Sequence, residues 1–179
     1  AFSPQSSKHR ATTTESVLPF ADWLEIVDPS WQWDAPHLAY VREHLARVTS
    51  GETTRLIITM PPRHGKTEHT TIRYAAWRME RDPGMRVIIT SYNQHLATEF
   101  SRKVRRIVRD RIGLASDRAA AGAWDSATGS SLRAAGVGAG VTGLGANLII
   151  IDDPIKSRLE ADSARVREST WNWFTDDLY

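Results

Sequence analysis

The sequence predicts an α/β fold in which a parallel sheet is flanked by helices. Three short and largely apolar runs carry this prediction: residues 56–60, 86–91 and 148–151. Strands that are covered by helices on both faces are apolar throughout, and stretches with helical spacing separate these runs. At 179 residues the chain is long enough for one domain with a core of its own.

Composition excludes several classes of protein. Twenty-three Lys and Arg stand against 21 Asp and Glu, so the formal net charge of +2 excludes a polybasic binder and permits only a local basic face. The sequence has no Cys, which excludes disulfide scaffolds, zinc ribbons and thiol nucleophiles. No apolar run is long enough to span a membrane, so we expect no membrane partner.

The first half is expected to contain an arm, two helices and one strand. Residues 1–20 are rich in Ser and Thr and lack periodicity, which predicts a flexible N-terminal arm. An Asp-Ala-Pro sequence and helically spaced apolar residues predict a helix over 35–49. The run 56–60 is predicted as a buried parallel strand, and residues 66–79 as a helix that ends before an Asp-Pro-Gly turn.

The second half repeats this alternation. A strand over 86–91 is followed by a helix that is capped by asparagine and extends to about residue 110. The Gly- and Ala-rich stretch 112–147 is expected to hold one or two short strands. Residues 148–151 are the third buried strand, and a last helix is predicted from residue 162 or 163 to 174.

A loop with phosphate-binding character lies between the first strand and its helix. Backbone N–H groups and the positive end of the helix dipole favour phosphate there. In this interpretation Gly65 lets the backbone approach, Lys66 places a cation on the β- and γ-oxygens, and Thr67 offers a hydroxyl to Mg²⁺. The alternative is that Gly-Lys-Thr is only a helix start. The predicted nucleotide-binding residues are Pro62, Arg63, His64, Gly65, Lys66, Thr67 and Glu68.

The loop departs from the common pattern for such sites. Met60 stands where a first glycine is usual, and two prolines stiffen the turn that follows. Arg63 and His64 add polar groups, and Arg63 is a candidate sensor of the γ-phosphate.

Carboxylates follow the third strand directly. The carboxyl ends of parallel strands are where ligands bind in open sheets. We predict that Asp152 holds Mg²⁺ together with Thr67, and that Asp153 orients or deprotonates the attacking water. Glu160 is the alternative for that second role, because a longer side chain suits an attacking water; a strand-ending turn without function is the other possibility.

Three further features have weaker support. Transfer of a phosphoryl group usually needs an arginine, for which Arg133, Arg63 and Arg158 are candidates. The basic stretch 102–111 either lies on DNA phosphates or is a solvated charged face. An adenine could be framed by aromatic residues upstream of the loop, namely Trp31, Trp33, His37 and Tyr40.

Taken together, these motifs resemble the ATPase domain of the large terminase subunit of tailed bacteriophages and prophages. The resemblance extends from about Trp31 to the end of the chain and depends mainly on the Pro-Pro-Arg-His-Gly-Lys-Thr loop and the Asp-Asp-Pro-Ile-Lys strand end. It implies a P-loop NTPase of the ASCE type over residues 21–179, with ATP and Mg²⁺ as ligands. In the family pattern Arg63, Lys66 and Thr67 match the phosphate loop, and Asp152 and Asp153 match the acidic strand end.

The resemblance also implies a biological role. The implied role is that of a motor that packages double-stranded viral DNA into a procapsid in the host cell cytoplasm. The expected partners are DNA, the portal protein, the small terminase subunit and further copies in a ring. Family members carry a C-terminal nuclease domain and a further strand after the acidic strand, and neither is visible before Tyr179. We therefore expect the ATPase domain to be incomplete at its C-terminus and its isolated activity to be weak or absent.

Two other functions remain open on the sequence. A helicase-type ATPase has a similar nucleotide site but needs a second motor domain. A non-catalytic nucleotide- or DNA-binding fragment that docks on a partner needs none of the hydrolytic residues.

Overall fold

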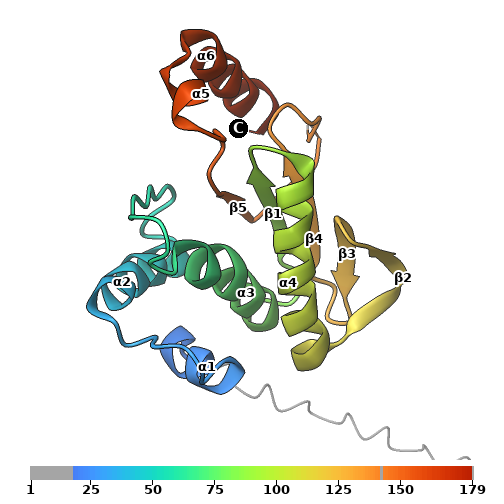
Figure 1. Cartoon of the computed structure of the whole chain (residues 1–179). Coiled ribbons are helices and arrows are strands. Elements are labelled where there is room, and N and C mark those ends of the chain that lie inside the picture. Colours follow the sequence, from blue (N-terminus) through green and yellow to red (C-terminus); the bar gives the residue numbers. More distant parts are fainter. Residues whose placement is uncertain (1–17, 142, 179) are drawn as a thin grey trace, which may run out of the picture.

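The computed structural model describes residues 18–141 and 143–178, and its centre is a five-stranded sheet (Figure 1). Most of the arm predicted over residues 1–20 lies outside the described residues. The strand order is β2-β3-β4-β1-β5. The strands are β1 (Arg86–Ser91), β2 (Leu114–Ala120), β3 (Ala123–Ser126), β4 (Ser131–Gly136) and β5 (Leu148–Ile151).

The sheet is mixed, which corrects the prediction of a wholly parallel one. β1 runs parallel to both β4 and β5, as predicted for the strands over 86–91 and 148–151. The pairs β2–β3 and β3–β4 are antiparallel. Their connections are too short for the crossover that parallel neighbours need, so the stretch 112–147 folds as a meander of three strands.

The predicted strand over 56–60 is wrong for this structure. The segment is drawn as a loop in Figure 1, and within the described residues it pairs with no strand. Leu56, Ile58 and Met60 pack partly against the core, whereas the side chain of Ile57 is 91% exposed. The alternating burial is that of an extended chain, but a strand also needs a hydrogen-bonding neighbour, and none of the described strands supplies one.

Helices cover both faces of the sheet. The helix predicted over 35–49 is confirmed as α2, and the one predicted from 94 is confirmed as α4. The helix predicted from residue 162 or 163 to 174 is confirmed as α6, and the short helices α5 and η2 precede and follow it. The elements are α1 (Phe20–Val27), α2 (Pro36–Ser50), η1 (Thr67–Tyr74), α3 (Ala75–Arg81), α4 (Gln94–Ile112), α5 (Arg158–Asp162), α6 (Ala164–Trp173) and η2 (Phe174–Leu178).

The helix predicted over 66–79 is present, but it begins in an unusual way. Its first eight residues, η1, are π-helical, and α3 continues it as an α-helix. Short π-helical stretches are rare and often lie at functional sites.

Two groups of apolar side chains lie on opposite faces of β1. Val87 and Ile89 belong to the main core, which joins the sheet to α1–α4 and contains Trp23, Trp33 and Trp124. Ile88 belongs to a smaller group with Trp173 and Leu178 of the C-terminal helices. Both faces of the central strand are therefore covered, which explains its apolar sequence.

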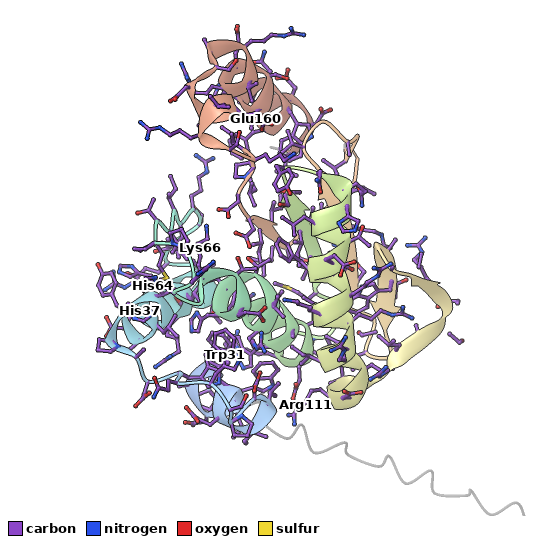
Figure 2. All side chains as sticks on the ribbon, viewed as in Figure 1. Trp31, His37, His64, Lys66, Arg111 and Glu160 are labelled. Carbon is purple, nitrogen blue, oxygen red and sulfur yellow. The ribbon has the colours of Figure 1, made fainter. Side chains whose placement is uncertain are left out.

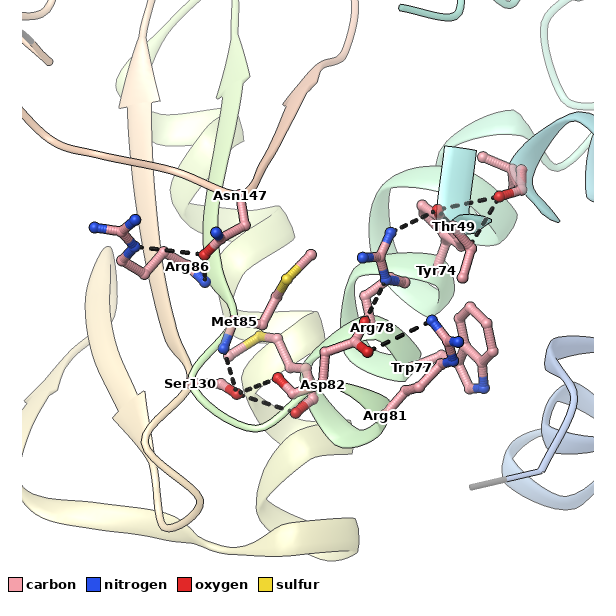
Figure 3. Close-up of polar contacts among 12 residues, drawn as sticks. Thr49, Tyr74, Trp77, Arg78, Arg81, Asp82, Met85, Arg86, Ser130 and Asn147 are labelled. Carbon is pink, nitrogen blue, oxygen red and sulfur yellow. Dashed lines mark hydrogen bonds and ion pairs between the residues drawn. The ribbon is translucent and has the colours of Figure 1, made fainter. Parts of the chain in front are cut away.

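Polar contacts fix the turn between α3 and β1 (Figure 3). The hydroxyl of Ser130 lies 3.1 Å from the carbonyl oxygen of Met79 and accepts a hydrogen bond from the backbone N–H of Met85. On the other side of β1, the backbone N–H of Arg86 donates to Asn147 Oδ1 at 3.0 Å. These contacts align the first residues of β4, β1 and β5. Because these three strands are parallel, their carboxyl ends are aligned at the opposite edge of the sheet.

Within the described residues, no helix is long and apolar enough to cross a membrane.

Candidate functional site

The loop before η1 adopts a conformation that requires glycine. Gly65 has φ +84°, in the left-handed region that other residues rarely adopt. A Cβ at this position would lie 3.5 Å from the ring of Trp31 and 3.6 Å from Leu38. These are ordinary van der Waals distances, so the positive φ, and not a lack of space, is what favours glycine at this position.

Lys66 joins this loop to the acidic end of β5. Its Nζ lies 2.5 Å from Asp153 Oδ1 and 3.6 Å from Asp152 Oδ1, although the two carboxylates lie more than eighty residues further along the chain. Burial alone would lower the pKa of Lys66, but the hydrogen bond to Asp153 and the negative charges of both aspartates outweigh burial and raise it. The predicted meeting of the loop and the carboxylates is present, and Lys66 is charged at neutral pH.

Backbone strain is found on both sides of this contact. Among the described residues, Arg63 (φ +62°) and Asp153 (φ +47°) are the non-glycine residues with positive φ. Such conformations cost about 1–3 kcal/mol each and cluster at functional sites. Their location in the two segments that meet at Lys66 marks the same site independently of the sequence motif.

The residues predicted to hold Mg²⁺, Asp152 and Thr67, carry the oxygen atoms that this ion prefers. The described residues contain no cluster of three or more His, Cys, Asp or Glu that could hold a metal ion alone. Mg²⁺, however, is commonly held by one or two carboxylates together with substrate phosphates. Asp152 is 4% exposed and has one oxygen 3.6 Å from Lys66 Nζ, so this carboxylate fits a metal site that is shared with phosphates.

One residue of the site is absent from the sequence-based prediction. Thr71 Oγ1 donates a hydrogen bond to Asp152 Oδ2 at 2.9 Å, and both side chains are buried. The signal that could have identified it is its spacing: Thr71 lies four residues after Thr67 on the same helical segment, so both can face the acidic strand end.

The structure does not bring Glu160 or Arg133 to this site. Glu160 lies on α5, well away from Lys66 in Figure 2, and its carboxylate accepts a hydrogen bond from the backbone N–H of Lys156. Arg133 on β4 instead donates to the carboxylate of Asp125 on β3, at 3.2 Å. Of the two candidates for orienting water, only Asp153 contacts Lys66.

The remaining loop residues are held by local contacts. His64 Nδ1 lies 2.8 Å from the carbonyl oxygen of Pro62, and His37 Nε2 lies 3.1 Å from the carbonyl oxygen of His64 (both histidines are labelled in Figure 2). The carboxylate of Glu68 faces the other way, toward Lys103 of α4 at 2.6 Å. Any contribution of Glu68 to phosphate binding would therefore come from its backbone N–H.

A hollow of about 400 Å³ lies beside the loop. Trp31, His37 and His64 are among the residues that line it. Trp31 is 39% exposed and stacks on the buried Trp33, with ring centroids 5.1 Å apart and planes 11° apart. Of the four residues expected around an adenine, Trp31 and His37 line this hollow. Trp33 is buried against Trp31, and Tyr40 packs against His44.

The basic face predicted over 102–111 is largely neutralised by neighbouring carboxylates. On α4, Arg102 pairs with Glu99 and Arg109 lies 2.8 Å from Asp110. At its end, Arg111 reaches Glu80 at 2.5 Å. These contacts favour the interpretation as a charged face over that of a dedicated DNA surface.

Comparison with known proteins gives one match. The family model for the N-terminal region of the terminase large subunit, T4likevirus-type, matches residues 47–178. Comparison with curated proteins found no match.

Proposed function

Because the chain belongs to the terminase large-subunit family, in its T4-like N-terminal region, we propose that it is the ATPase motor part of a viral DNA-packaging terminase. In this proposal the fold is that of a P-loop NTPase, with ATP and Mg²⁺ as ligands. The observation that carries the proposal is the contact of Lys66 with Asp152 and Asp153, which joins a glycine-containing turn before a helix to the acidic end of the edge strand β5.

The chemistry we propose is attack of water on the γ-phosphorus of ATP. A new P–O bond forms to the water oxygen, the bond to the β-phosphate oxygen breaks, and the water proton passes to Asp153. Asp152 and Thr67 would hold Mg²⁺, which would supply positive charge to the phosphate oxygens. Lys66 must exchange Asp153 for phosphate oxygens, and this exchange frees the Asp153 carboxylate to accept the proton.

The proposed partners follow from the family. We propose double-stranded viral DNA as the substrate that is moved, with the portal protein, the small terminase subunit and other copies of the chain as assembly partners. The family match favours this role over the helicase-type alternative.

Calorimetric titration with ATP tests the nucleotide site. We expect one saturable site per chain whose affinity increases when Mg²⁺ is added. The Asp153→Asn variant is expected to bind ATP at least as tightly as the wild type, because it loses both the ion pair that holds Lys66 and one negative charge near the triphosphate. Absence of binding to the folded wild-type chain would refute the proposal.

The hollow beside the loop is proposed to hold the base. Stacking of a base on an aromatic side chain contributes about 1–3 kcal/mol, so Trp31→Ala is expected to weaken ATP binding about 10-fold. The same variant should bind inorganic tripolyphosphate as the wild type does, since that ligand has no base. Trp171→Ala removes another exposed indole, on α6, and is the matched control. Equal losses for both ligands would contradict stacking at Trp31.

A further inference from the structure

The hydrogen bond between Thr71 and Asp152 distinguishes the two oxygens of one carboxylate. Thr71 Oγ1 donates to Asp152 Oδ2 at 2.9 Å, while Oδ1 of the same group lies 3.6 Å from Lys66 Nζ. Thr71 is 2% exposed, so water does not compete for this bond. One oxygen is therefore engaged by a buried hydroxyl, and the other is directed toward the phosphate-binding lysine.

The main chain fixes the same aspartate from the other side. The backbone N–H of Asp152 donates to the carbonyl oxygen of Thr90 at 2.9 Å, which continues the β1–β5 ladder by one residue. With the backbone held by the sheet, rotation of the side chain is the remaining freedom, and the Thr71 hydroxyl restricts that rotation.

A second buried hydroxyl adjoins Asp152 in the sheet. Thr90 of β1 pairs with Ile151 of β5, so Ser91 and Asp152, the next residue of each chain segment, are neighbours at the end of this pair. The Ser91 side chain is fully buried, and its hydroxyl has no hydrogen-bond partner among the described residues. Without Thr71, the carboxylate can rotate toward this hydroxyl, because a buried unpaired acceptor takes whatever donor is within reach.

From these contacts we infer that Thr71 is a positioning residue that determines which oxygen of Asp152 faces the metal. The inference rests on the proposed function, since it assigns Asp152 to Mg²⁺. Thr71 lies on η1, which begins at Thr67, so a single helical segment carries both the hydroxyl offered to the metal and the hydroxyl that orients the carboxylate. Loss of such outer contacts typically weakens metal binding 10- to 100-fold.

The test compares two adjacent threonines. Thr71→Val keeps the side-chain shape but removes the hydroxyl, and Thr71→Ser restores it. Thr70→Val is the matched control, because the Thr70 hydroxyl is buried on the same segment and has no partner among the described residues. For each variant, ATP affinity is measured by calorimetry with and without Mg²⁺, and the melting temperature is recorded.

In Thr71→Val we expect ATP affinity without Mg²⁺ to be unchanged and the gain on adding Mg²⁺ to fall about 10-fold. Thr71→Ser and Thr70→Val should keep the wild-type gain. A purely structural role would lower the melting temperature of Thr71→Val but leave that gain intact, and this result would overturn the inference alone. If the wild-type chain binds no ATP, or gains nothing from Mg²⁺, the proposed function fails and the inference fails with it.

Discussion

Replacing Lys66 by alanine is expected to weaken ATP binding about 100-fold, since a hydrogen bond to a charged group contributes about 1.5–3 kcal/mol and the lysine is proposed to contact two phosphates. The reason lies in the position of the ammonium group. It is held 2.5 Å from Asp153, and the two aspartates raise its pKa, so it is a fixed positive charge where the triphosphate would bind. Calorimetry with ATP and Mg²⁺ measures the loss.

Two controls separate binding from folding. Lys66→Met keeps the apolar stem of the side chain and should lose as much affinity as Lys66→Ala. Lys156→Ala removes another lysine and should bind ATP normally. The melting temperature of each variant shows whether the buried Asp152 tolerates loss of its neighbouring cation. Unchanged ATP affinity in a folded Lys66→Ala protein would show that the loop is not a phosphate-binding loop.

The second large expected effect is a loss of folding stability in acid, and it arises from His69. This side chain is fully buried against the rings of Phe20 and Trp33, and neither ring nitrogen has a hydrogen-bond partner among the described residues. Burial, together with the charges of Arg42 and Arg73 and the neighbouring His37, lowers the pKa of His69 from 6.5 to about 3. The folded chain therefore keeps this imidazole neutral under conditions where the unfolded chain protonates it.

Proton uptake by the unfolded state determines how the free energy of unfolding changes with pH. Between pH 6.5 and about 3 the unfolded state binds the proton and the folded state does not, so the free energy of unfolding falls as the pH falls. One pKa unit corresponds to about 1.4 kcal/mol, which gives a loss of about 2 kcal/mol between pH 7 and pH 5 from this residue. Urea unfolding at several pH values measures this loss of stability.

His69→Leu should lose this component of the acid sensitivity, whereas His95→Gln, at an exposed histidine of α4, should keep it. An NMR titration of wild-type His69 gives an independent reading that does not require the variant to fold. Its ring signals should stay unchanged from pH 8 to pH 4, and a midpoint near 6.5 would contradict the account.

Local sequence patterns predicted the elements that are specified by their own residues. The helices α2 and α4 follow from their apolar spacing and from the residues at their starts. The strands β1 and β5 follow from their apolar runs, and their parallel pairing brings the acidic end of β5 beside the end of β1. The meeting of Lys66 with Asp152 and Asp153 was predicted on the premise that two parallel strands bring them to one edge of the sheet; the contact is present, although residues 56–60 before the loop form no strand.

Features set by distant partners were not predictable in the same way. The run 56–60 has strand composition, but whether it forms a strand depends on a neighbour that its own sequence does not specify. Glu160 and Arg133 are suitable residue types, but their side chains have other partners. Glu160 accepts a hydrogen bond from the backbone of Lys156, and Arg133 donates to Asp125 of β3. The spacing of Thr71 from Thr67 places both on one side of η1, but the hydrogen bond of Thr71 to Asp152 also depends on the close approach of η1 to the strand end, a tertiary distance that the spacing does not give.

The most direct test of the central claim is a crystal structure of the chain with Mg²⁺ and a non-hydrolysable ATP analogue. The account predicts β- and γ-phosphates on the loop over 61–67, with Lys66 moved from Asp153 onto their oxygens. It also predicts the metal between the Thr67 hydroxyl and Asp152. A nucleotide bound elsewhere, with the Lys66–Asp153 ion pair intact, would contradict it.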